Sequence, residues 1–78
     1  MKVDWDHLRY FLILARAKTL TNAARIMGVE HSTVARRIQA LEQSLGMQLF
    51  KREATGYELT IEGLALIPRV EQMEQSFL

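Results

Sequence analysis

The spacing of apolar residues predicts that most of this chain is helical. Within residues 30–46 the apolar side chains stand at i, i+4, i+7 and i+11, the pattern of a helix that buries one face. Helical spacing also runs through residues 4–17, through the shorter segment 20–27 and from residue 60 to residue 78. The apolar positions of the 30–46 segment are Val34, Ile38, Leu41 and Leu45.

Residues that start and stop helices stand at the ends of these segments. Thr19 and Thr60 are good N-caps, because a threonine hydroxyl accepts a hydrogen bond from a free backbone N–H. Gly28 and Gly46 suit the left-handed conformation that often ends a helix. Pro68 lies inside the last helix, where it removes one backbone hydrogen bond and predicts a bend.

In residues 47–60 the apolar residues no longer recur at helical spacing but alternate with polar ones. This pattern predicts a short β-hairpin with a turn at the letters EATG. A lone two-stranded hairpin is only marginally stable in water, so it must lean on the helices. The expected anchors are Leu49, Phe50 and Leu59. The predicted fold class is therefore mainly α, with three helices and a hairpin followed by one long helix.

A short helix, a glycine turn and a longer helix with a polar outer face form a helix-turn-helix. The second helix of such a pair enters the DNA major groove with its N-terminal residues at the bases. Arg36 and Arg37 lie on the predicted outer face, and a guanidinium group suits phosphate oxygens or guanine edges. The alternative is a solvated helix face with a salt-bridge network that includes Glu42. The two arginines alone do not decide between these interpretations.

Composition and charge narrow the function further. A chain of 78 residues predicts one domain, and the absence of cysteine excludes disulfides and thiolate metal ligands. Residues 1–52 hold nine Lys/Arg and four Asp/Glu, a net charge of +5, whereas residues 53–78 hold one Arg and five Glu, a net charge of −4. The basic part either meets a polyanion or is a solvated surface, and charge alone leaves both open.

Several function classes find little support in the sequence. It has no glycine-rich phosphate loop and no nucleophile spaced from a base, which argues against an enzyme. Nothing in it calls for a metal or another cofactor, and His7 is expected to be a surface residue near a helix start. No apolar run approaches the roughly 20 residues of a membrane span, and no signal pattern opens the chain, so a cytoplasmic protein without membrane contact is expected.

Four segments together resemble the N-terminal domain of LysR-type transcriptional regulators. They are LRYF at 8–11, TLTNAARIMGV at 19–29, STVARRIQALEQSLGMQLFKR at 32–52 and LTIEG at 59–63. The resemblance implies a winged helix-turn-helix over residues 1–59, with the hairpin as the wing, and a linker helix over residues 60–78 that pairs two subunits. It also implies a C-terminal effector domain that this chain does not contain.

The resemblance also implies which residues meet DNA. His31 stands where the family often has a base-contacting glutamine, Arg36 matches the family's arginine, and Arg52 matches the arginine that reaches the minor groove. Glu30 stands at the usual serine cap, where it either repels phosphate or accepts a hydrogen bond from a cytosine amine, and the sequence leaves this open. The expected DNA-binding residues are Thr21, Glu30, His31, Ser32, Thr33, Arg36, Arg37, Lys51 and Arg52. The expected dimerisation residues are Leu66, Val70, Met73 and Phe77.

The expected partners follow from these assignments. They are a pseudo-palindromic double-stranded operator and a second copy of the chain, while a small-molecule effector would bind only through the missing domain. The rival interpretation is a winged-helix module for protein–protein interaction or dimerisation that does not bind DNA. Steeply salt-dependent binding to duplex DNA would separate the two, because counterion release marks phosphate contact.

Overall fold

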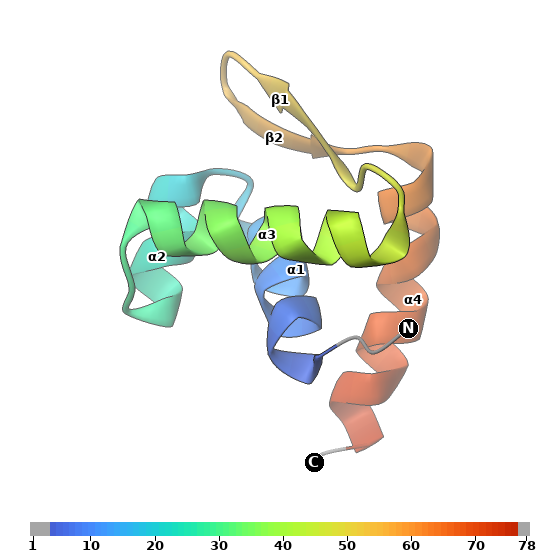
Figure 1. The fold of residues 1–78 in the computed structure, drawn as a ribbon. Coiled ribbons are helices and arrows are strands. Elements are labelled where there is room, and N and C mark those ends of the chain that lie inside the picture. The colour runs from blue at the N-terminus through green and yellow to red at the C-terminus, as the bar shows by residue number, and fades with distance from the viewer. Residues whose placement is uncertain (1–3, 77–78) are drawn as a thin grey trace.

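The computed structural model describes residues 4–76 and confirms the predicted order of elements. In chain order, residues 4–76 form three helices, a hairpin and a fourth helix, arranged as in Figure 1. The elements are α1 (Trp5–Ala17), α2 (Leu20–Met27), α3 (His31–Leu45), β1 (Phe50–Glu53), β2 (Gly56–Leu59) and α4 (Ile61–Ser76). Among residues 4–76, no helix is both long enough and apolar enough to cross a membrane.

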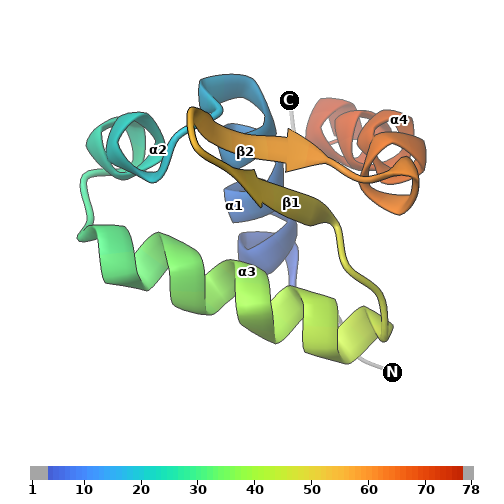
Figure 2. The same ribbon diagram turned by 90° about the horizontal axis from the view of Figure 1, so that it is seen from above.

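Helix α1 is the centre of the fold. Both views show α2 and α4 on opposite sides of α1, with α3 crossing it and the hairpin above (Figures 1 and 2). Phe11 and Leu14 of α1 are fully buried, as are Val34 and Leu41 of the predicted α3 stripe. The same helix therefore buries apolar side chains against all three of its helical neighbours.

The hairpin is held against the helices at two points, because a two-stranded hairpin is only marginally stable by itself. Its strands pair antiparallel, with Phe50 opposite Leu59. The Phe50 ring lies 5.5 Å from the Phe11 ring and 6.1 Å from the Tyr57 ring, measured between centroids. The Tyr57 backbone N–H donates to the Lys18 carbonyl at 2.7 Å. Aromatic packing holds one end of the wing, and this hydrogen bond holds the other to the turn between α1 and α2.

The predicted caps are confirmed. The Thr19 hydroxyl accepts from the Asn22 N–H at 3.1 Å. The Thr60 hydroxyl accepts from the Gly63 N–H at 3.0 Å and donates to the Gln48 carbonyl at 2.7 Å. Thr60 therefore starts α4 and ties that start to the entry of the wing.

Helix α4 packs against its own domain more closely than the sequence predicts. Val70, one of the expected dimerisation residues, is fully buried against the core of its own chain and leaves no exposed surface for a partner. Leu66 is half-buried, Met73 is 45% exposed, and Phe77 lies outside the described residues. Ile61 and Leu64, on another face of the helix, are 85% and 64% exposed.

Two contacts explain why α4 lies so close to the rest of its domain. At Gly63, even a methyl group would collide with the Leu49 carbonyl oxygen, so the missing side chain permits the approach. Further along, the Arg16 guanidinium donates two hydrogen bonds to the Glu74 carboxylate, at 3.2 and 3.4 Å. Hydrogen bonding to Glu74, with attraction to Glu71, raises the pKa of Arg16. With α4 held against the Leu49 segment near its start and against α1 near its end, Val70 between these contacts is covered.

Replacing Gly63 by alanine tests this close approach. Alanine normally favours a helix interior over glycine by about 1 kcal/mol. Here we expect Gly63→Ala to lower the free energy of unfolding by about 1–3 kcal/mol, because the added methyl group overpacks the contact with the Leu49 carbonyl. Urea unfolding measures the change. Ala65→Gly at an exposed position of the same helix is the control, with a loss of about 1 kcal/mol from propensity alone. A Gly63→Ala protein more stable than the unmodified chain would contradict the packing described.

Candidate nucleic-acid interface

The outward face of α3 is polar along its whole length. Because Val34, Ile38 and Leu41 are buried, side chains on the opposite side of the helix are directed to solvent. The outward face consists of Ser32, Arg36, Gln39 and Gln43, all exposed. These residues carry hydrogen-bond donors suited to base edges or phosphate, and this confirms the predicted exposure of Arg36.

Arg37 is exposed but does not point the same way as Arg36. Its guanidinium carbon lies 5.7 Å from the centroid of the Tyr10 ring, and Tyr10 belongs to the core. Its Nη1 atom lies 3.4 Å from Nε2 of His7. The expectation that both arginines point away from the core therefore needs correction for Arg37, which leans onto α1. His7, half-buried, is more than a solvated surface residue.

The start of α3 meets the wing and α2 at one groove. Thr21 from α2, His31 from α3 and Arg52 from β1 all line it, together with the hairpin turn. Thr21, His31 and Arg52 are exposed. Three of the predicted DNA-binding residues, each from a different segment of the sequence, are thus brought together on one side of the molecule.

The neighbouring residues of the α3 start are mostly open to solvent. Ser32 and Glu30 are exposed, and Thr33 is half-buried. Glu30 occupies the N-cap position of α3 without a side-chain hydrogen bond to the helix, as expected for glutamate. Its carboxylate is therefore not used as a cap and lies beside the residues that begin the outward face.

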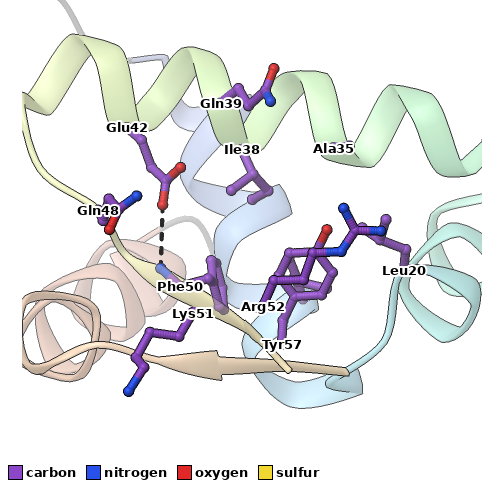
Figure 3. A pocket seen from close by; sticks show the side chains of 11 residues that line it. Leu20, Ala35, Ile38, Gln39, Glu42, Gln48, Phe50, Lys51, Arg52 and Tyr57 are labelled. Atoms are coloured by element: carbon purple, nitrogen blue, oxygen red, sulfur yellow. Dashed lines mark hydrogen bonds between the residues drawn. The ribbon is translucent and has the colours of Figure 1, made fainter. Parts of the chain in front are cut away.

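A second groove separates α3 from the wing (Figure 3). Ala35 and Gln39 line it on the helix side, and Lys51 and Arg52 line it on the strand side. In Figure 3 the Arg52 side chain extends toward Leu20 while the Lys51 side chain extends the other way. Lys51 is also the cross-strand neighbour of an acidic residue, since it pairs with Glu58. Of the two basic residues of the wing, Arg52 is therefore the one that does not lie opposite an acidic residue on the paired strand.

Glu42 has a role that the sequence did not reveal. Its carboxylate accepts a hydrogen bond from the backbone N–H of Leu49 at 2.7 Å. It accepts another from the backbone N–H of Phe50 at 3.3 Å (Figure 3). Within the described range 4–76, the ion pairs involve Arg16 and not Glu42, so the salt-bridge network that we considered for Glu42 does not form there. Glu42 instead ties the C-terminal half of α3 to the first residues of the wing.

Comparison with known proteins decides the family. The family model described as "Bacterial regulatory helix-turn-helix protein, lysR family" matches residues 5–64, which is more than half of the chain. The chain belongs to the lysR family. Both the resemblance drawn from the four sequence segments and the predicted winged helix-turn-helix are confirmed.

Relatives in the lysR family are transcriptional regulators by name. The chain is 43% identical over 66 residues to the transcriptional activator AmpR of Citrobacter freundii, covering 85% of this chain and 23% of AmpR. It is 31% identical over 77 residues to the uncharacterized regulator YbhD of Escherichia coli K12, covering 99% of this chain and 24% of YbhD. The chain thus spans about a quarter of the length of these two relatives.

Solved structures of lysR-family domains have the same fold. The crystal structure of the CbnR DBD–DNA complex superposes with a TM-score of 0.89 at 32% identity, covering 94% of this chain and 84% of that one. The complex of the BenM DBD with the benA site 1 DNA gives a TM-score of 0.90 at 28% identity, covering 96% of this chain and 87% of that one.

Removing the Glu42 carboxylate tests its role at the wing. Glu42→Ala leaves two part-buried N–H groups without their acceptor, so we expect a loss of about 1–3 kcal/mol in the free energy of unfolding. Glu42→Gln keeps an acceptor oxygen and should lose less. Urea unfolding and hydrogen exchange at the Leu49 amide measure both effects. The exposed Gln43→Ala is the matched control, and a Glu42→Ala protein as stable as this control would refute the assignment.

Proposed function

We propose that this chain binds double-stranded DNA sequence-specifically, as the DNA-binding domain of a lysR-family transcriptional regulator. One observation carries the proposal: the α3 face opposite the buried stripe is lined by exposed hydrogen-bonding side chains and is flanked by a wing with an exposed arginine. The similarity to the CbnR and BenM domains, whose complexes contain DNA, supports it.

Helix α3 is the proposed recognition helix in the major groove. His31, Ser32 and Thr33 begin it and would lie over base edges, while Thr21 at the start of α2 would meet the flanking backbone. Glu30 either repels phosphate or accepts from a cytosine amine, and the operator sequence would decide between them. Arg36 stands in the middle of the outward face and would bind a guanine edge or a nearby phosphate.

The wing is proposed to reach the adjacent minor groove. Arg52 would enter this groove, because a narrow A·T-rich minor groove has an enhanced negative potential that attracts arginine. Lys51, beside Glu58, would make a weaker phosphate contact. Because its relatives are named as transcriptional regulators, we assign the domain no catalytic activity and no cofactor, and we expect it to act in the cytoplasm.

Residues 60–78 are proposed as the linker helix that pairs two copies, with residues 1–59 as the DNA-binding unit. Ile61 and Leu64 expose large apolar surfaces on α4. On another face of the same helix, a groove lined by Leu8, Leu66 and Met73 is open to solvent. Exposed apolar side chains and an open apolar groove on one helix of a small domain suit a second copy of the same helix. Such a pair would present two recognition helices about 34 Å apart, which calls for a pseudo-palindromic site.

Selection of duplexes from a random-sequence library, followed by Arg36→Ala, tests DNA recognition. The unmodified chain should enrich a common sequence and bind it with strong salt dependence. On that duplex Arg36→Ala should cost about 1–3 kcal/mol of binding free energy, if Arg36 reads a base in the bidentate manner. Fluorescence anisotropy at physiological salt measures it. An unchanged affinity would remove Arg36 from the interface, and no salt-dependent DNA binding at all would favour the protein–protein module.

Leu64→Glu tests the proposed dimer. The substitution places a charge on an exposed apolar position without disturbing the core, unlike any change at the buried Val70. We expect a folded monomer with much weaker operator binding, since each half-site then binds alone. Sedimentation measures whether the protein is monomeric, and circular dichroism measures whether it is folded. Ile26→Glu, at an isoleucine of α2 that is 61% exposed, is the matched control and should keep the dimer. An unmodified chain that is monomeric at high micromolar concentration would contradict the proposal.

A further inference from the structure

Two side chains of α1 hold the Arg37 guanidinium. Tyr10 lies beneath it, with the ring centroid 5.7 Å from the guanidinium carbon, and His7 lies beside it, with 3.4 Å between Nη1 and Nε2. Tyr10 is only 8% exposed and His7 is half-buried, so both supports are fixed by the packing of α1. In this hydrogen bond the guanidinium donates, because arginine has no acceptor, and Nε2 of His7 accepts.

Among residues 4–76, no carboxylate forms an ion pair with Arg37. The ion pairs found within residues 4–76 belong to Arg16, which contacts Glu71 and Glu74. A guanidinium carries five N–H donors, and an imidazole nitrogen and an aromatic ring face leave most of them available. Arg37 is thus a positioned cation that is exposed to solvent and retains donors for an anion.

The position of Arg37 on α3 selects the kind of anion. Successive residues of a helix are rotated by roughly 100°, so Arg37 lies to one side of Arg36, toward α1. The outward face of Ser32, Arg36 and Gln39 would meet the groove, and the α1 side of this face would meet the sugar–phosphate backbone at the groove edge. A guanidinium already held in place loses less conformational entropy when it binds a phosphate than a free one does.

We propose that Arg37 binds a backbone phosphate at the edge of the major groove, and that His7 and Tyr10 are positioning residues that hold its guanidinium there. The proposal rests on the proposed DNA-binding function and assigns different roles to the two adjacent arginines. Arg36 reads the groove, whereas Arg37 fixes the domain on the backbone from a site built by α1 and α3.

Salt-dependent binding of the selected duplex and of an unrelated duplex tests the phosphate contact. Loss of one phosphate contact lowers the slope of log K against log salt by about 0.9. Arg37→Ala should therefore reduce the slope by about this amount and weaken binding several-fold on both duplexes alike. Arg36→Ala, by contrast, should reduce the preference for the selected duplex. Thermal unfolding checks that the Arg37→Ala protein remains folded, as its exposed position predicts.

A double-mutant cycle tests the positioning role of His7. His7→Phe keeps a ring but removes the acceptor, and should weaken binding in the unmodified chain. The same change should have no effect in the Arg37→Ala background, and His7→Gln, whose amide oxygen accepts, should restore binding.

Two results would overturn the proposal: an unchanged salt slope for Arg37→Ala, or an equal His7→Phe loss in both backgrounds. If the unmodified chain shows no salt-dependent binding, the proposed function itself fails, which is a distinct outcome.

Discussion

The burial of one side of α3 against the core is the constraint on which the rest of this structure depends. Val34 and Leu41 have no solvent exposure, and Ile38 has only 4%. Burying each such side chain contributes about 1.5–3 kcal/mol, so rotation of the helix about its axis would expose several of them at a large cost. The face that carries Arg36 is therefore fixed outward by the core.

The wing and the last helix are then positioned relative to α3 by a few polar contacts. The Glu42 carboxylate receives the first N–H groups of the wing, and Thr60 connects the end of the wing to α4. These bonds lie next to the buried Leu49 and Phe50, which supply the apolar contact that a short hairpin lacks by itself. The distance from the α3 start to Arg52 is thereby fixed by the fold before DNA is met, which reduces the entropy lost on binding.

Much of this fold was predictable from local signals in the sequence. The helices, their threonine caps and glycine ends, and the hairpin anchors Leu49 and Phe50 all follow from periodicity and from backbone preference. The exposure of Arg36 followed from the same periodicity. The contact residues assigned by family resemblance remain predictions, although Thr21, His31 and Arg52 do line one groove.

What the sequence could not supply were contacts between distant segments. The spacing of Leu66, Val70 and Met73 identified an apolar stripe, but periodicity does not say whether a stripe is covered by its own chain or by a partner. The cover of Val70 depends on Gly63 and on the Arg16 pair, which involve residues far apart in the chain. The contact of Arg37 with His7 joins residues 30 positions apart, so no local pattern indicates it.

The most direct test of the central claim is a map of amide chemical-shift changes when the isotope-labelled chain is titrated with its selected duplex. If the buried stripe fixes the outward face of α3 toward DNA, the largest changes will fall at residues 30–37 and at residues 51–56 of the wing. The amides of buried Leu14 and Val70 should change little. Changes concentrated on α4, with those of the α3 start unaffected, would contradict the account.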